Sequence, residues 1–381
     1  MTKKVKVLTV FGTRPEAIKM SPLVLELKKH EAEIESYVTV TGQHREMLDQ
    51  VLDIFQVVPD YDLNIMKARQ TLADVTTNAL LGLDGTMKEL QPDIVLVHGD
   101  TTTTFVASLA AFYNQIAIGH VEAGLRTFNK YSPFPEEANR QLTGVLTDLH
   151  FAPTKQAAKH LLDENKAEDA IFITGNTAID ALKTTVSEAY EHEILEKVGS
   201  SRLVLLTAHR RENLGQPMKN IFKAVHRLVE AHPDIQVVYP VHLNPAVREI
   251  AGEILGDHER IHLIEPLGVV DFHNFAAKAE IILTDSGGVQ EEAPSLGTPV
   301  LVLRDTTERP EGIEAGTLKL AGTDEDDVFH MAHELLTNSE AYQQMAKASN
   351  PYGDGQASAR IVDAILYHFG HRPNRPTPFN P

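Results

Sequence analysis

Cysteine is absent from all 381 residues of this sequence. The chain can therefore form no disulfide, present no thiolate nucleophile and bind no zinc through cysteine ligands. Because disulfides belong mainly to oxidising compartments, their absence favours a reducing one, and we expect a cytoplasmic protein. Any nucleophile or proton carrier has to be a residue of another type.

Long apolar runs are also missing. A membrane-spanning helix needs about 18 consecutive apolar residues, and no stretch of this sequence approaches that length. The apolar stretch from Val5 to Gly12 stops at Arg14-Pro15, so we expect no signal peptide. The sequence therefore predicts a protein without a membrane partner.

Basic residues are few relative to acidic ones. The sequence has 35 lysines and arginines against 53 aspartates and glutamates, which gives a formal net charge of −18. Such a charge repels a nucleic-acid backbone, so we expect no nucleic-acid partner. Small anions can still bind where arginines and backbone N–H groups gather, because a site's own charges outweigh distant, screened ones.

The residues that are present indicate an ordinary globular protein of two domains. Hydrophobic residues make up 42% of the chain and charged residues 23%, and domains average roughly 150 residues. We expect a first domain over residues 1–175 and a second over 176–356. The boundary is placed near Gly175, where Thr174 to Thr177 combine turn formers with a helix N-cap.

Short β-branched runs alternate with longer amphipathic segments in both halves. Such alternation predicts right-handed βαβ units on parallel sheets, hence two Rossmann-like doubly wound domains facing across a cleft. The predicted strands are Lys4–Val10, Ile34–Thr41, Ile94–His98, Ile116–Val121 and Leu149–Ala152 in the first half, and Arg202–Thr207, Gln236–Val241, Ile261–Ile264, Ile281–Thr284 and Val300–Leu303 in the second.

Two segments outside this alternation also have expected structures. A polar stretch, Thr177–Val198, reads as one helix at the start of the second half. Near the end of the chain, a helix within residues 357–372 follows a loop long enough to return the chain to the first domain. The proline-rich tail, His371–Pro381, is expected to lie uncovered.

Polar residues follow the predicted strands at the sheet edge where open parallel sheets bind ligands. After the first strand, a glycine turn leads to Arg14 and, one turn further on, Lys19. Backbone N–H groups and cations at this helix start could meet a phosphate. An ordinary strand-to-helix turn explains these residues equally well.

Two carboxylates follow neighbouring strands of the first half. Asp100 comes just after the strand that ends at His98, and Glu122 just after the next strand. Asp100 could instead be a helix N-cap. The period of a strand would put His98 beside Asp100 and His120 beside Glu122, which resembles a metal site, but buried strand histidines are more often core residues. We therefore expect no metal.

Further candidates open helices or turns. Glu136 and Arg140 lie four residues apart at a helix start, where an exposed ion pair is the simplest explanation. In the second half, a strand ends shortly before His209, a titratable base beside two arginines. The turn Ser286-Gly287-Gly288 opens a helix bearing Glu292 and could hold a diphosphate. It has neither a Walker lysine nor the GxGxxG spacing, so no nicotinamide cofactor is expected.

Taken together, these motifs resemble the bacterial non-hydrolysing UDP-N-acetylglucosamine 2-epimerases. They run in order from Phe11 to Glu311 and cover most of both halves. The resemblance implies a GT-B architecture, with the substrate between the domains and the last helix crossing back. The motifs that carry it are FGTRPEAIKM, TGQHREM, HGDTTT, HVEAGLRT, PFPEEANR, TAHRREN, DSGGVQEE and RDTTERPE.

The resemblance also implies roles for individual residues. Phe272 would lie against the uracil, while Leu267 replaces a polar residue of some relatives. A second UDP-N-acetylglucosamine would bind as an activator, and a homodimer is expected. The implied UDP ligands are His209, Ser286, Gly287, Gly288 and Glu292. The residues implied to lie near the diphosphate or sugar are Arg14, Lys19 and Arg309, and those implied to surround the sugar are Asp100, Glu122, Glu136 and Arg140. The implied contacts of the activator are Gln43, Arg69, Gln70, Glu136, Arg210 and His242.

The implied reaction is the reversible epimerisation of UDP-N-acetylglucosamine at carbon 2, supplying cell-surface polysaccharide synthesis. Carbon 2 has no adjacent carbonyl, so the family's route is elimination of UDP to 2-acetamidoglucal and re-addition. Asp100, Glu122 and Glu136 would share the acid and base roles, with His209 at the leaving diphosphate. A GT-B glycosyltransferase, a hydrolysing epimerase and a non-catalytic UDP-sugar sensor remain alternatives, although the three carboxylates favour epimerisation.

Overall fold

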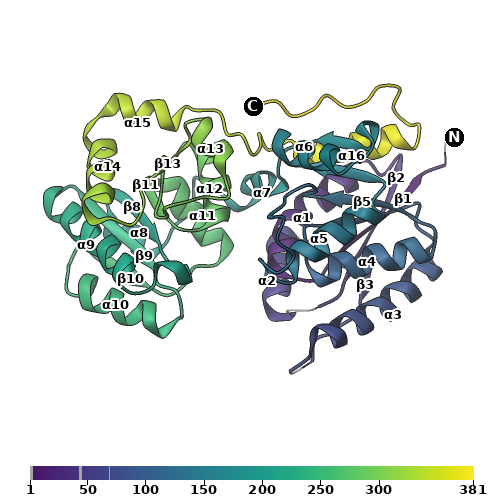
Figure 1. Ribbon diagram of the computed structural model, residues 1–381, viewed down its shortest axis with the longest axis horizontal. Helices are drawn as coiled ribbons and strands as arrows, with labels where there is room; N and C mark the ends of the chain where they lie inside the picture. Colours follow the sequence, from purple (N-terminus) through teal and green to yellow (C-terminus); the bar gives the residue numbers. More distant parts are fainter. Residues whose placement is uncertain (1–2, 43–44, 68) are drawn as a thin grey trace. The chain divides into compact units, whose positions relative to one another are not determined.

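Parallel sheets of seven and six strands organise the chain into two units, as the computed structural model shows (Figure 1). The structure describes residues 3–42, 45–67 and 69–381. The first unit extends to Ala181 and includes Gly353–Asn380, and the second comprises Leu182–Tyr352. Among the described residues, every helix is too short or too polar to cross a membrane.

The first sheet has the strand order β3-β2-β1-β4-β5-β6-β7. Because β1 lies between β2 and β4, the winding reverses beside it, which defines a doubly wound sheet and its switch point. Parallel strands are covered on both faces, and this explains their almost continuous apolar sequences. The strands are β1 (Val5–Phe11), β2 (Ile34–Val40), β3 (Tyr61–Asp62), β4 (Ile94–His98), β5 (Ala117–Val121), β6 (Leu149–Ala152) and β7 (Ile171–Ile173).

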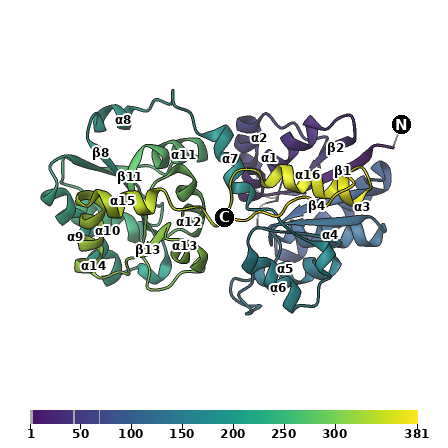
Figure 2. The same ribbon diagram turned by 90° about the horizontal axis from the view of Figure 1, so that it is seen from above.

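Helices cover both faces of this sheet. Alternate residues of β1 point into different cores: Val7 packs with α1, α2 and α16, and Leu8 packs with α3 and α4. Helix α16 lies against α1 (Figures 1 and 2). The helices are α1 (Arg14–Lys29), α2 (Arg45–Phe55), α3 (Leu72–Leu90), α4 (Thr102–Tyr113), α5 (Glu136–Leu146), α6 (Lys155–Asp163), α7 (Thr177–Thr185) and α16 (Ala357–His368), with a 3₁₀ turn η1 (Glu168–Ala170).

The second sheet repeats this design with the order β10-β9-β8-β11-β12-β13. Its strands are β8 (Arg202–Thr207), β9 (Ile235–Pro240), β10 (Ile261–Ile264), β11 (Ala279–Thr284), β12 (Val300–Val302) and β13 (Leu318–Leu320). Its helices are α8 (Glu193–Val198), α9 (Gln216–Ala231), α10 (Pro245–Leu255), α11 (Val269–Lys278), α12 (Gly287–Glu292), α13 (Pro310–Glu314), α14 (Glu325–Thr337) and α15 (Ser339–Ala346), with 3₁₀ turns η2 (Arg211–Asn213) and η3 (Ala293–Leu296).

The predicted fold class, two Rossmann-like doubly wound domains, is confirmed. The single helix expected over Thr177–Val198 is wrong, because α7 ends at Thr185 and α8 begins at Glu193. Side chains of α11 hold the intervening segment in a non-helical path. Asn274 accepts a hydrogen bond from the backbone of Ser187, and the Tyr190 hydroxyl donates to Asp271 at 2.6 Å.

The division between the units falls a little later than the expected boundary at Gly175. The first unit continues to Ala181 because the carboxylate of Asp180 caps the start of α16. It accepts hydrogen bonds from the backbone N–H groups of Ala357 at 3.2 Å and Ser358 at 2.9 Å. The first turns of α7 are therefore tied to the returning C-terminal segment.

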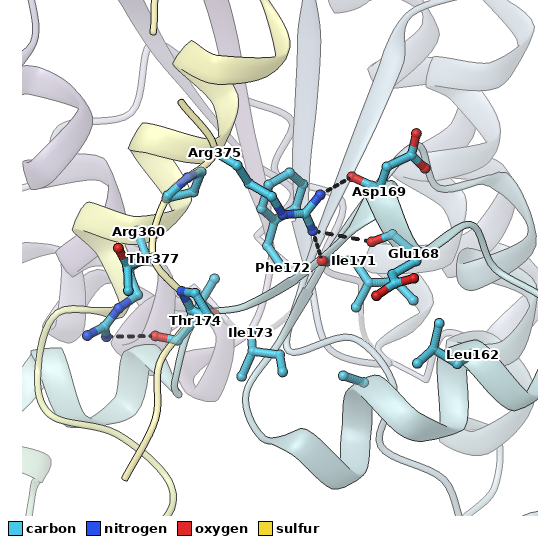
Figure 3. A pocket seen from close by; sticks show the side chains of 13 residues that line it. Leu162, Glu168, Asp169, Ile171, Phe172, Ile173, Thr174, Arg360, Arg375 and Thr377 are labelled. Atoms are coloured by element: carbon cyan, nitrogen blue, oxygen red, sulfur yellow. Dashed lines mark hydrogen bonds between the residues drawn. The ribbon is translucent and has the colours of Figure 1, made fainter. Parts of the chain in front are cut away.

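The tail is exposed at most of its residues, as expected, but two of its side chains anchor it to the first unit. Arg375 stands over the ring of Phe172 and donates to the carbonyl of Asp169 at 2.8 Å, as Figure 3 shows. Phe379 is only 4% exposed, and its N–H donates to the carbonyl of Ile173. Strand β7 is the last strand of the sheet, so the tail satisfies carbonyl groups that a sheet edge leaves unpaired.

Candidate functional site

Two turns at the carboxyl edge of the first sheet present the predicted carboxylates. Strands β4 and β5 end at His98 and Val121, and the next residues bend sharply, with φ of +69° at Gly99 and +61° at Glu122. The left-handed conformation is uncommon for a glutamate and is typical of constrained functional turns. Because both strands end before these turns, the alternation of side chains along a strand does not extend to Asp100 or Glu122.

Glu122 is buried against two basic side chains. Lys19 Nζ lies 2.8 and 3.0 Å from its carboxylate oxygens, and His98 Nε2 lies 2.8 Å from Oε2. Burial alone would raise the pKa of Glu122, but the charges of Lys19 and His98 outweigh it and hold this pKa well below its usual range. The side chain is therefore a carboxylate at neutral pH.

Arg140 connects the two turns. Its Nη2 lies 2.5 Å from Asp100 Oδ2, and its Nη1 donates to the backbone carbonyl of Glu122. Asn139, the preceding residue, donates to the carbonyl of Asp100 at 3.0 Å. Arg140 is 5% exposed, so the interpretation of an exposed ion pair with Glu136 is wrong. The start of α5 instead holds both carboxylate-bearing turns in place.

Asp100 is not the N-cap of α4. The N-cap is Thr101, whose hydroxyl accepts a hydrogen bond from the Thr104 N–H at 3.1 Å. This contradicts the alternative explanation of Asp100 as a capping residue. Its carboxylate is a third exposed and pairs with Arg140, which leaves it available at the edge of the sheet.

Glu16 is a site residue that the sequence analysis did not single out. Although 1% exposed, its carboxylate accepts hydrogen bonds from the N–H groups of Gly12 and Thr13 and from the hydroxyls of Thr101 and Thr104. It thereby ties the turn after β1 to the turn after β4. The capping-box pattern of Thr13 and Glu16 reveals the local half of this role, but not the contact with the second turn.

The neighbouring histidines are core residues rather than a ligand set. His120 Nε2 lies 2.7 Å from the Gly99 carbonyl, and burial, together with the charge of Arg140, holds the pKa of His120 well below its ordinary value. Burial also lowers the pKa of His150 to about 4. Within the described ranges, no group of three or more histidine, aspartate or glutamate side chains could hold a metal ion.

The other candidates of the first unit lie at the starts of helices or just before them. Arg14 is the first residue of α1 and Glu136 the first of α5, and both side chains are half-buried. Arg69 and Gln70 precede α3, with Arg69 exposed in a left-handed conformation. Gln43 lies outside the described residues.

The carboxyl edge of the second sheet is organised around Asp285, which sequence analysis noted only as part of a turn. Asp285 follows β11 and is fully buried. Its Oδ2 accepts the N–H groups of His209 and Arg210 at 2.8 and 2.9 Å and the side-chain amide of Asn213 at 3.1 Å. Burial raises the pKa of Asp285, but the hydrogen bonds from His209 and Arg210 more than offset it and keep this pKa low.

Two guanidinium groups lie over the glycine turn after Asp285. Nη2 of Arg309 and Nη2 of Arg210 lie 3.7 and 3.8 Å from the point where Gly287 would carry a Cβ atom. Arg210 also donates from Nε to the Asp285 carbonyl, and Arg309 donates to Glu291. The turn Ser286-Gly287-Gly288 therefore lies beside two cations and next to the start of α12, an arrangement suited to a phosphate.

The remaining candidates of the second unit surround this turn or lie on α11. The ring of His242 stacks on His209 with centroids 5.5 Å apart. Glu292 Oε2 lies 3.3 Å from His273 Nε2. Phe272 is half-buried and packs with Leu267 against the core on that face of the sheet.

Two doubly wound units, each with charged side chains at the carboxyl edge of its sheet, define a GT-B-like α/β protein. The family model described as UDP-N-acetylglucosamine 2-epimerase matches residues 25–366, and the chain belongs to this family. The resemblance predicted from the motifs is thus confirmed.

Individual relatives are similar over nearly their whole length. The chain is 70% identical to the UDP-N-acetylglucosamine 2-epimerase of Bacillus subtilis (strain 168), with 99% of each chain covered. It superimposes on a crystal structure of UDP-N-acetylglucosamine 2-epimerase with a TM-score of 0.95, 67% identity and 100% of both chains covered. The Neisseria meningitidis enzyme bound to UDP-GlcNAc gives a TM-score of 0.83 at 51% identity, covering 95% of this chain and 100% of that one.

Proposed function

We propose that this protein interconverts UDP-N-acetylglucosamine and UDP-N-acetylmannosamine by inverting carbon 2 of the sugar. The observation that carries the proposal is the pair of acidic turns in the first unit, where Glu122 is ionised by Lys19 and His98 and Asp100 is held by Arg140. The relative from Neisseria meningitidis, of the same family and fold, is described as bound to UDP-GlcNAc.

The proposed route is elimination followed by re-addition. A carboxylate removes the proton from carbon 2 while the bond between carbon 1 and the UDP oxygen breaks, which leaves 2-acetamidoglucal and UDP. The UDP oxygen then attacks carbon 1, and an acid delivers a proton to the opposite face of carbon 2. We assign the proton transfers to Asp100, Glu122 and Glu136, because positioned carboxylates can both accept and donate protons.

The second unit would bind the nucleotide. Arg210 and Arg309 beside the turn Ser286-Gly287-Gly288 supply positive charge for the departing diphosphate, and His209 would contact the diphosphate beside them. Glu292 would accept the ribose hydroxyls and Phe272 would lie against the uracil, while Arg14, Lys19 and Arg140 would stabilise charge near the sugar. No redox cofactor is required, because elimination and re-addition leave the oxidation state of the sugar unchanged overall.

The test is an incubation with UDP-N-acetylglucosamine in deuterium oxide, followed by NMR and mass spectrometry. We expect UDP-N-acetylmannosamine carrying deuterium at carbon 2, because the proton removed exchanges with solvent before a proton is returned. Product without deuterium would contradict the route. Free N-acetylmannosamine with UDP would indicate a hydrolysing epimerase, and binding without turnover a sensor.

We also propose that a second molecule of UDP-N-acetylglucosamine activates the enzyme, as the family resemblance implies, through Gln43, Arg69, Gln70, Glu136, Arg210 and His242. Two of these residues, Arg210 and His242, lie directly beside His209, so an activator that contacts them would act on the nucleotide-binding turn. The enzyme would act in the cytoplasm, and its product would supply the synthesis of cell-surface polysaccharide.

A homodimer is proposed through the outer face of α3, α4 and α5, which are neighbouring helices (Figure 1). Large apolar side chains are exposed there, including Leu81, Phe112 and Val145, the last of them 70% exposed. Apolar surface that gathers on one face of a protein is typical of a site that another protein covers. The large apolar side chains exposed on these three helices are Leu72, Leu81, Phe112, Tyr113, Leu142 and Val145.

Substitution of Val145 by aspartate is expected to convert the dimer into a monomer, because it would bury an unpaired charge in the apolar contact. Sedimentation velocity at micromolar concentration measures the change. Val58→Asp is the matched control, because Val58 is 76% exposed and lies outside this face. A dimer that survives Val145→Asp, or one that Val58→Asp dissociates as readily, would place the interface elsewhere.

A further inference from the structure

We infer that Asp285 is a positioning residue that sets the protonation pattern of His209, holding the proton on Nδ1 and directing Nε2 toward the bound diphosphate. The inference rests on the proposed function, because it assigns a task to a histidine of the proposed UDP site. It concerns a buried carboxylate that makes no contact with the substrate in the proposed reaction, and that acts through the ring of His209.

The first observation is that the two carboxylate oxygens of Asp285 face different groups. Oδ2 is occupied by the backbone N–H groups of His209 and Arg210 and by the amide of Asn213. Oδ1 lies 3.1 Å from His209 Nδ1, an ion-pair distance, and no donor of the described part of the chain reaches it in hydrogen-bond geometry. One oxygen therefore holds the loop, and the other faces the ring.

The second observation is that Asp285 can only accept. It is fully buried, and burial raises its pKa, yet the His209 side chain and the backbone N–H groups of Arg210 and His209 keep this pKa low, so the group is an ionised carboxylate at neutral pH. A carboxylate has no proton to donate, and the ring nitrogen that faces it must therefore carry one. His209 thus has Nδ1–H, whether the ring is neutral or charged.

The third observation is the surroundings of the ring. His242 stacks on one face of His209 at 5.5 Å, and the backbone of His209 is fixed through its own N–H, so the ring cannot turn freely. Arg210, the next residue, directs its guanidinium to the glycine turn beside Gly287. His209 is 38% exposed, which leaves Nε2 as the ring atom available to a ligand. With Nδ1–H directed at Asp285, the doubly protonated form of the ring would donate from Nε2 to a phosphate oxygen of the leaving group.

Substitution of Asp285 by asparagine separates this role from loop holding. The oxygen of the introduced amide would have to replace Oδ2, because the backbone N–H groups of His209 and Arg210 need an acceptor. The NH₂ group of that amide would then face His209 Nδ1, which would have to become an acceptor. The ring would carry its proton on Nε2, and Nδ1, facing a donor, could not take up a second proton, so the doubly protonated form would be excluded.

The primary measurement is ¹⁵N NMR of histidine-labelled protein, with the His209 signal assigned by its loss in His209→Gln. We expect the Nδ1–H form or the doubly protonated form in the unchanged protein and the Nε2–H form in Asp285→Asn. Asn213→Ala is the matched control, because it removes another hydrogen bond to Asp285 and loosens the same loop without altering what faces Nδ1. An Nε2–H ring in the unchanged protein would overturn the inference, and this result does not require that any variant folds.

The functional measurement is a double-mutant comparison. Asp285→Asn is expected to lower kcat by about 10²–10³-fold, the loss typical of one misplaced donor to a developing charge, and to weaken UDP binding. If Asp285 acts through the ring, adding Asp285→Asn to His209→Gln should cause little further loss of kcat. If the losses of kcat in the two single variants multiply in the double variant, Asp285 acts independently of His209. If the unchanged protein binds UDP but does not epimerise UDP-N-acetylglucosamine, the proposed reaction is contradicted. The NMR measurement still tests the role of Asp285 in that case.

Discussion

Substitution of Glu122 by glutamine is expected to lower kcat for epimerisation by at least about 10²–10⁴-fold, the usual contribution of one positioned proton carrier. Glu122 is one of the three carboxylates to which the proposed reaction assigns the proton transfers. Its left-handed turn places it against Lys19 and His98, and their charges keep it ionised in spite of its burial. Glutamine has nearly the same shape but cannot accept the proton of carbon 2.

The control for this variant is Glu164→Gln in the same unit. Glu164 pairs with Arg126 at 2.6 Å, and that hydrogen bond is the main reason why the pKa of Glu164 is lowered, so the control removes an ion-paired carboxylate away from the proposed site. Initial rates from a coupled assay and deuterium exchange at carbon 2 should fall together in Glu122→Gln and stay close to normal in Glu164→Gln. Retained exchange in Glu122→Gln would assign proton removal to Asp100 or Glu136.

Replacement of Gly124 by alanine is expected to destabilise the protein by about 2–4 kcal/mol, because strain at a left-handed position and overpacking each contribute about 1–3 kcal/mol. Gly124 has a φ of +88°, and an added Cβ would lie 2.2 Å from the carbonyl oxygen of Ala157, far inside a contact distance. The glycine of this motif is therefore explained by a close approach of α6 to the turn that carries Glu122.

Gly252→Ala is the control, and its expected effect on stability has the opposite sign. Gly252 lies within α10, and, among the described residues, no atom apart from the adjoining backbone of its own helix would lie within 4 Å of its added methyl group. Alanine is favoured over glycine inside a helix, so we expect this variant to gain about 0.5–1 kcal/mol. Urea unfolding curves of both variants at one pH measure the difference. Equal stability of Gly124→Ala and the unchanged protein would mean that the turn after β5 moves aside without loss.

Local patterns were sufficient to predict the fold. The alternation of apolar runs and amphipathic segments identified the longer strands, because a parallel strand covered on both faces has to be apolar along its length. Strands β3, β7 and β13 escaped prediction; each has only two or three residues, although β12, also of three residues, was predicted. The break between α7 and α8 escaped it as well, since it depends on Asn274 and Asp271, which are distant in sequence.

The candidate site residues were chosen on local grounds and stay a prediction. Asp100, Glu122 and His209 stood out because they directly follow apolar strands, and the order of the motifs indicated the family. Asp285 and Glu16 did not stand out, because an acidic residue in a turn or a capping box has a sufficient local explanation. Their partners come from other turns of the same sheet edge.

The sequence by itself therefore determined the class of fold, the family and the residue types available for proton transfer and phosphate binding. Only the tertiary structure decided which of these groups touch, and hence which of them are ionised. Arg140 pairs with Asp100 rather than lying exposed beside Glu136, and Asp285 faces His209. The reason is physical: strand and helix periods follow from neighbours along the chain, whereas the charge of a buried group depends on whichever side chains the folded sheet brings within a few ångströms.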